Sequence, residues 1–206
     1  MFYFLLAISV LIPVAILGGF IYAYKKLPRR YFVLLTVTVI GGPYLAFKLY
    51  ERQFMLEAVP DALDVSSITY SKEESWGFGP GGNEAGIRLY PMPENISQDI
   101  KKRGVEFFRD MPANKNQQGR SSRGRYEDWA VTPIQPTDRW GTNKESGRMD
   151  ICDQICGDAF GVDVKPAVQE VVNAIINSPG SYYAYGRTGL IIVSPEKNLV
   201  IYFYSK

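Results

Sequence analysis

Two long apolar runs open the chain, with a short basic turn between them. The first run, residues 2–24, has no charged side chain and is long enough to cross a hydrocarbon core of about 30 Å as a helix. The second run, at about residues 31–49, is shorter, and Gly41-Gly42-Pro43 is expected to bend it. The pattern therefore predicts a transmembrane helical hairpin over residues 1–50.

Two other interpretations of the apolar runs are less favoured. A cleaved signal peptide begins with a basic segment and has a shorter apolar stretch than residues 2–24. A buried hairpin in a soluble protein would need a larger domain to cover it, because both runs are apolar on all sides.

Beyond the hairpin, the pattern predicts a connector at residues 51–65, limited by Pro60, and a soluble α+β domain at residues 66–206. Apolar residues alternate in some segments of this domain and recur at helical spacing in others. Strands are expected at residues 66–74, 85–92, 126–134, 181–187, 189–194 and 198–205, and helices at residues 93–111 and 163–177. This order predicts a mostly antiparallel sheet covered by two helices.

The basic turn determines the expected topology. It carries four cations, whereas the far end of the second run has two cations offset by two acids. The four are Lys25, Lys26, Arg29 and Arg30. Because Lys and Arg in short loops tend to stay in the cytoplasm, we expect a cytoplasmic turn and a periplasmic α+β domain. The predicted location is the bacterial inner (cytoplasmic) membrane, with two spans in the lipid bilayer.

The charge outside the hairpin argues against nucleic acid as a partner. Five of the 23 basic residues and none of the 21 acidic residues occur in the first 50 positions, which leaves 18 basic residues against 21 acidic ones. A domain with a formal charge near −3 has no general attraction for phosphate backbones.

Cys152 and Cys156 lie four positions apart and form a candidate disulfide. The bridge would be feasible in irregular chain and poor inside a regular helix, where the Cα atoms lie near the upper bound for bridging. The alternatives are two unpaired buried thiols or, with less support, a metal site. The chain has no histidine, so a metal would need carboxylates such as Asp150, Asp153 and Asp158 as further ligands.

Two polar segments are candidate contact surfaces. Residues 76–86 are rich in glycine, and Trp76 and Phe78 could form an aromatic contact there; the alternative is a flexible hairpin connection. A basic group in residues 101–125 could contact an anion or a protein partner; the alternative is a solvated loop. Its candidate contact residues are Lys101, Lys102, Arg103, Arg120, Arg123 and Arg125.

The chemistry-bearing residues do not predict an enzyme. Without histidine there is no Ser-His-Asp or Cys-His machinery, and no cofactor is predicted. A hydrolase would have to use carboxylates, and the spacing of the available ones singles out no pair. These carboxylates are Glu73, Glu74, Glu84, Glu127 and Asp128.

The sequence therefore predicts a membrane-anchored, non-enzymatic binding domain that recognises a protein or envelope ligand. An immunity-type protein against a toxin acting on the membrane or periplasm would have this layout. The alternatives are a structural subunit of an envelope membrane complex and, with less support, a carboxylate-dependent cell-wall or lipid hydrolase. No oligomeric state is predicted, although Gly18-Gly19 or Gly41-Gly42 could allow close helix approach.

Overall fold

The computed structural model describes residues 18–76, 83–114, 124–136, 140, 147–156, 161–187 and 189–205. The chain separates into two compact units, Met1–Gln53 and Phe54–Lys206.

The N-terminal unit contains the apolar helix. Residues 18–26 are helical, and after Leu27-Pro28 the chain continues through α2 (Arg29–Thr36), a π-helical turn η1 (Val37–Gly41) and α3 (Gly42–Leu56). Together these form one helix of 28 residues, Arg29–Leu56, which is long and apolar enough to cross a membrane. It is the single such helix in the described part of the chain. Residues 2–17 of the other predicted span lie outside the described residues, so the hairpin stays a prediction.

The helix runs through the expected bend and past the expected end at residue 49. Pro43 has no N–H for the carbonyl group four positions earlier, and its ring would clash with that carbonyl in a regular helix. The wider π-turn lies directly before Gly42-Pro43, where it can relieve this clash and let the helix continue to Leu56.

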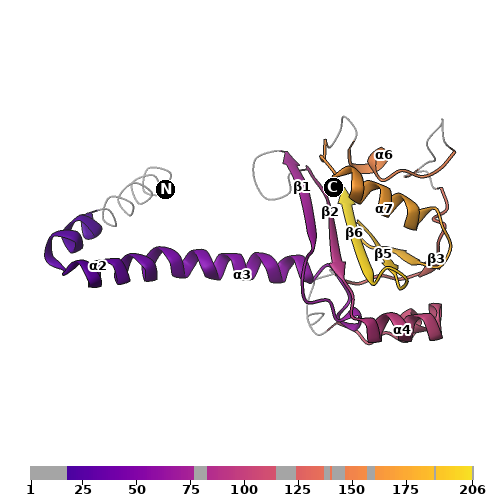
Figure 1. The fold of residues 1–206 in the computed structure, drawn as a ribbon, viewed down its shortest axis with the longest axis horizontal. Helices are drawn as coiled ribbons and strands as arrows, with labels where there is room; N and C mark the ends of the chain where they lie inside the picture. Colours follow the sequence, from indigo (N-terminus) through magenta and orange to yellow (C-terminus); the bar gives the residue numbers. More distant parts are fainter. Residues whose placement is uncertain are drawn as a thin grey trace, which may run out of the picture. The chain divides into compact units, whose positions relative to one another are not determined.

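The second unit is built on a six-stranded sheet (Figure 1). Its strands are β1 (Tyr70–Trp76), β2 (Asn83–Pro91), β3 (Ala130–Val131), β4 (Tyr182–Tyr185), β5 (Gly189–Ser194) and β6 (Leu199–Ser205). The strand order is β1-β2-β6-β5-β4-β3, and every neighbouring pair is antiparallel. The predicted α+β class with an antiparallel sheet is confirmed.

Helices cover both faces of this sheet. Side chains alternate along each strand, so Ile87 and Leu89 of β2 face one side while Arg88 and Tyr90 face the other. The first side packs against α6 (Cys152–Ile155) and α7 (Pro166–Ile176) and is called the α7 face. The other side packs against α4 (Glu94–Arg103), α5 (Val105–Arg109) and the connector, and is called the α4 face.

The strand predicted at residues 66–74 begins later, at Tyr70, and ends at Trp76. Two further predicted elements are divided or shortened in the structure. The helix predicted at residues 93–111 is divided at Gly104, which has φ 60° and ψ −139° and therefore ends α4 before α5 begins. The strand predicted at residues 126–134 is reduced to Ala130–Val131. Asp128 has a φ of 55°, and Pro133 has no backbone N–H to donate, so pairing ends on both sides.

Candidate functional site: a polar groove along α7

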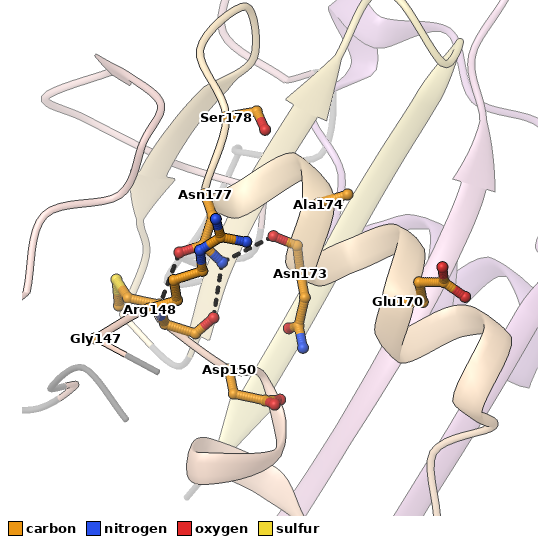
Figure 2. A pocket seen from close by; sticks show the side chains of 9 residues that line it. Gly147, Arg148, Asp150, Glu170, Asn173, Ala174, Asn177 and Ser178 are labelled. Atoms are coloured by element: carbon orange, nitrogen blue, oxygen red, sulfur yellow. Dashed lines mark hydrogen bonds between the residues drawn. The ribbon is translucent and has the colours of Figure 1, made fainter. Parts of the chain in front are cut away.

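A groove of about 730 Å³ runs along the outer side of α7 (Figure 2). One wall is the segment before α6, and the other is the exposed side and the end of α7. We call it the α7 groove. It is lined by Gly147, Arg148, Met149 and Asp150 from the segment and by Glu170, Asn173, Ala174, Asn177 and Ser178 from the helix side.

Two asparagines of the helix side hold the opposite wall in place. The side chain of Asn177 accepts a bond from Met149 N at 3.0 Å and donates one to Met149 O at 2.8 Å. Asn173 Oδ1 accepts a bond from Ile151 N at 3.0 Å. Residues four apart on a helix share one face, so Asn173 and Asn177 both point toward residues 149–151 (Figure 2). The groove wall is therefore attached to α7 by side-chain amides acting on the backbone.

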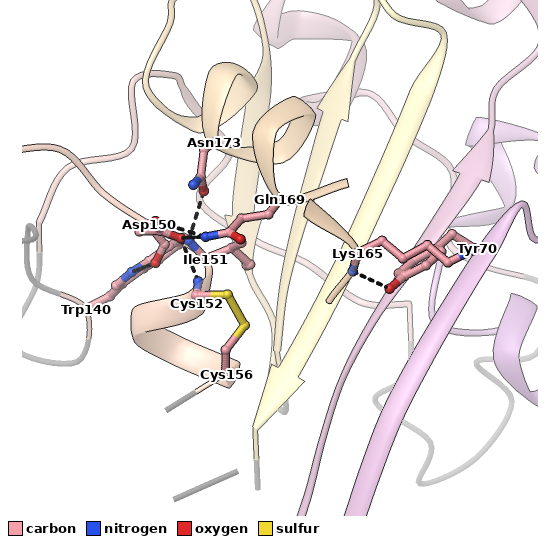
Figure 3. Close-up of a disulfide and its surroundings, with 9 residues drawn as sticks. All are labelled: Tyr70, Trp140, Asp150, Ile151, Cys152, Cys156, Lys165, Gln169 and Asn173. Atoms are coloured by element: carbon pink, nitrogen blue, oxygen red, sulfur yellow. Dashed lines mark hydrogen bonds between the residues drawn. A yellow bond between two sulfur atoms is a disulfide. The ribbon is translucent and has the colours of Figure 1, made fainter. Parts of the chain in front are cut away.

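Asp150 connects the groove wall to both α6 and α7. Its Oδ1 accepts a bond from Cys152 N at 2.9 Å, and Gln169 Nε2 donates to both carboxylate oxygens at 3.0 and 3.2 Å (Figure 3). Partial burial alone would raise the pKa of Asp150, but the bonds from Cys152, Asn173 and Gln169 outweigh it and lower that pKa. Asp150 is therefore an ionised acceptor at neutral pH and is poorly suited to act as a general acid.

The disulfide lies directly after this wall. Cys152 and Cys156 are joined with a Cα–Cα distance of 4.4 Å across the single turn of α6 (Figure 3). Residues four apart in a regular helix have Cα atoms about 6 Å apart, so this turn is tighter than a regular one. A helix of four residues has no further turns to enforce regular spacing, which explains why a bridge that is poor in a long helix forms here.

A second pocket, of about 460 Å³, lies at the ends of β5 and β6. Its lining includes Gln154 of α6, Trp140 and Tyr185. Trp140 Nε1 donates to Asp150 O at 3.2 Å. The segment of residues 147–156 therefore borders both cavities, because Asp150 lines the α7 groove and Gln154 lines the second pocket.

The predicted basic contact residues do not gather at the α7 groove. Lys101, Lys102 and Arg103 end α4, which covers the opposite face of the sheet. Arg103 forms ion pairs with Asp99 at 3.5 Å and Asp110 at 2.8 Å. Arg125 pairs with Glu127 at 2.7 Å, while Arg120 and Arg123 lie outside the described residues. Neighbouring acids therefore offset part of the predicted positive surface.

The other predicted contact and topology residues occupy separate places. Trp76 is the last residue of β1, and Phe78 lies outside the described residues. The four cations of the basic turn are all exposed. Lys25 and Lys26 end the first helical segment, and Arg29 and Arg30 begin α2.

Sequence reasoning missed a buried ionic cluster on the α4 face. Arg88 is 6 % exposed, and its guanidinium donates to Glu73 at 2.7 Å and to the Tyr204 hydroxyl at 3.0 Å. Tyr204 donates in turn to Glu73 at 2.8 Å. Partial burial alone would raise the pKa of Glu73, but the bonds from Tyr204 and Arg88 lower it. The available signal was one arginine inside the apolar run Ala85–Tyr90.

Gly86 explains how the three groups of this cluster come together. A Cβ at position 86 would lie 2.9 Å from the Glu73 Cβ and 2.9 Å from the Tyr204 hydroxyl. Only glycine leaves room for these two side chains to meet over β2.

The other carboxylates considered for a hydrolase are dispersed. Glu84 lies on β2, Glu127 is paired with Arg125, and Asp128 has a φ of 55° in the loop before β3. Within the described ranges, no three His, Cys, Asp or Glu side chains are grouped in a way that could hold a metal ion. No protein-family model, curated protein or solved structure matches the chain.

Proposed function

We propose that this chain is a membrane-anchored binding protein whose α+β domain recognises a protein or envelope ligand through the α7 groove. The groove carries the proposal. It presents both signs of charge, with Arg148, Asp150 and Glu170, beside amide and hydroxyl groups. Asp150 is held as an ionised acceptor and the asparagines hold the wall, so this arrangement favours recognition over proton transfer.

The proposed location is the periplasmic side of a bacterial inner membrane. The helix Arg29–Leu56 has no buried residue and exposes its apolar side chains, which a bilayer would cover. The four exposed cations of the basic turn favour a cytoplasmic turn. The Cys152–Cys156 disulfide is compatible with an oxidising compartment. An immunity-type protein that neutralises a toxin in the envelope would fit this placement.

Topology is tested with single thiols on either side of the helix. In a Cys152→Ser/Cys156→Ser background, Asn95→Cys on α4 is compared with Leu27→Cys in the basic turn; both positions are exposed. We expect a membrane-impermeant maleimide to label position 95 in intact spheroplasts and position 27 only after lysis. The reverse pattern would place the domain in the cytoplasm.

Recognition is tested by photo-crosslinking in cells. A photoreactive amino acid at Ala174 in the α7 groove is compared with one at Asn95, which is exposed on the opposite face of the domain. We expect a discrete adduct from position 174 and none from position 95. Equal adducts at both positions, or none at position 174, would reject the groove as the binding surface.

A structural subunit of an envelope complex is the second candidate. A Cβ added at Gly42 would meet no heavy atom within 4 Å, so another helix could approach closely there. This function predicts adducts from Leu45, which is 60 % exposed, and none from Ala174.

A further inference from the structure

We propose that the Cys152–Cys156 disulfide is a redox-active latch on the α7 groove, opened by exchange with a dithiol and closed again by exchange with a disulfide such as oxidised glutathione, which is reduced to two thiols. The inference rests on the proposed function in one respect, namely that the α7 groove binds a ligand. The redox behaviour belongs to the chain alone and is measured without any partner.

The first observation is that the bridge is accessible and local. Both cysteines are part-exposed, although Cys156 also packs against the core of the α7 face, and thiol–disulfide exchange depends on such exposure. The bridge spans four positions, and short loops gain little from closure. Such a disulfide contributes little to the stability of a domain of this size, and its removal should not unfold the sheet.

The second observation is that the turn has anchors that do not depend on the sulfur bond. Ile151 and Ile155 are fully buried in the core of the α7 face. Ile155 N donates to Ile151 O at 3.2 Å, and Val162 N donates to Ile155 O at 3.0 Å. Reduction should therefore loosen the turn while leaving it attached to the domain.

The third observation is the direct connection from the bridge to the groove wall. Cys152 N donates to the carboxylate of Asp150, and Gln169 of α7 holds the same carboxylate (Figure 3). Fixing the Cys152 sulfur limits how far its N–H can move, and so limits the position of Asp150. Asp150 itself lines the groove, so the bridge adds a restraint to the wall that Asn173 and Asn177 already hold, and reduction removes that restraint.

The exchange is balanced by a dithiol as reductant. One thiolate of the dithiol attacks Sγ of one cysteine, the S–S bond breaks, and the released cysteine sulfur takes up a proton. The second thiol of the dithiol then attacks the first dithiol sulfur in the mixed disulfide, and the second cysteine is released as a thiol. Two electrons and two protons pass to the protein, and the dithiol becomes a disulfide.

The test uses the full chain in detergent micelles with dithiothreitol as the probe. Alkylation followed by intact-mass measurement counts the free thiols, and hydrogen exchange is measured in the oxidised and reduced states. We expect two alkylated cysteines under native conditions, with exchange about tenfold faster in residues 147–156 and unchanged in β5 and β6. Removal of dithiothreitol and addition of oxidised glutathione, which takes up the two electrons, should restore the slow exchange.

The matched control is Cys152→Ser/Cys156→Ser, which should show the fast exchange with or without dithiothreitol. Three outcomes would overturn the latch: no alkylation under native conditions, unchanged exchange in residues 147–156 after reduction, or an equal increase throughout the sheet. Because no partner is present, failure here leaves the crosslinking result at Ala174 independent.

Discussion

Both faces of the sheet are covered by helices, but the buried side chains on the two faces differ in kind. On the α7 face, the buried residues that the strands and α7 contribute are mainly aliphatic, such as Ile176, Ile192 and Ile201. On the α4 face, aromatic residues with polar tips are prominent, among them Tyr90, Tyr202 and Tyr204, and Arg88 is buried beside them. On the α7 face most of the contact between the helix and the sheet is apolar, with a bond from Lys165 N to the Tyr70 hydroxyl at 3.1 Å at the start of α7. The α4 face adds several hydrogen bonds from buried tyrosine and arginine side chains.

Two of these hydrogen bonds hold the end of α3 and the start of the connector on the α4 side of the domain. Tyr90 donates its hydroxyl to Met55 O at 2.8 Å, and Tyr126 donates to Ala58 O at 2.7 Å. The connector buries Ala58, Val59 and Leu63 in the same core, and the hydroxyl groups of Tyr90 and Tyr126 add hydrogen bonds to two nearby carbonyl groups. The comparison predicts that the α7 face is sensitive to lost volume and the α4 face to lost hydrogen bonds.

The largest effect is expected from Ile176→Ala on α7. Ile176 is fully buried, and its truncation removes apolar contact and leaves a cavity. We expect the free energy of unfolding to fall by about 3 kcal/mol in urea titrations. Ala174→Ser on the exposed side of the same helix is the control, with an expected change below about 0.5 kcal/mol. A loss below about 1 kcal/mol for Ile176→Ala would contradict the volume-sensitive face.

Arg88→Met should give the largest loss on the α4 face. It leaves Glu73 and Tyr204 without their buried donor, and we expect a loss of about 2 kcal/mol at pH 7. Glu73→Gln should cost less, because the Glu73 side chain is 50 % exposed and water can replace part of its contacts.

The pH dependence separates the charge of this cluster from its packing. The pKa of Glu73 is lowered in the fold, so its contribution is present above the unfolded pKa of about 4.5 and is lost as pH falls through the lower folded pKa. Arg88→Met should therefore reduce the loss of stability between pH 5 and pH 3 in parallel urea titrations. The same acid dependence in both proteins would show that the ion pair contributes nothing.

Tyr90→Phe should cost about 1 kcal/mol, because it leaves the carbonyl of Met55 without its buried donor. Tyr182→Phe is the matched control, since the described residues provide no hydrogen bond to the Tyr182 hydroxyl, and it should change stability by less than about 0.5 kcal/mol. Equal losses in the two variants would contradict the role assigned to the directed bonds.

Tyr90 also predicts an alkaline limit of stability. Burial raises the pKa of Tyr90 to about 12, although Arg88 opposes the shift. The contribution is complete below the unfolded pKa of about 10 and is lost as pH rises toward 12. Urea titrations at pH 9, 10 and 11 should therefore show falling stability, with a shallower fall in Tyr90→Phe. Parallel curves would rule out Tyr90 as a source of this dependence.

The smallest effect is expected from Arg103→Ala on α4. Its ion pairs are exposed, with side-chain exposures of 39 % for Arg103 and 67 % for Asp110. We expect a loss of about 0.5 kcal/mol that disappears in about 1 M salt, because solvent and ions screen such pairs. A loss as large as that of Arg88→Met would remove the distinction between buried and exposed ion pairs.

Features that depend on local spacing were predictable. The apolar helix follows from a long run without charge, α7 from apolar residues at helical spacing, and the three C-terminal strands from short runs of β-branched and aromatic residues. Each of them appears in the structure. The α+β class follows from the order of these elements. The break at Gly104 and the two-residue β3 were missed, because a backbone conformation at one residue overrode a period that continues on both sides.

The tertiary structure alone decided the sheet order and the α7 groove. β2 pairs with β6 across more than a hundred residues, and this pairing brings Arg88 to Tyr204. The groove wall depends on Asn173 and Asn177, which bond to residues 22 and 28 positions earlier. Asparagines on a helix have no local pattern that distinguishes them from solvated ones. Their role appears only when folding places a backbone segment opposite them, because a hydrogen bond depends on distance in space and not on distance along the chain.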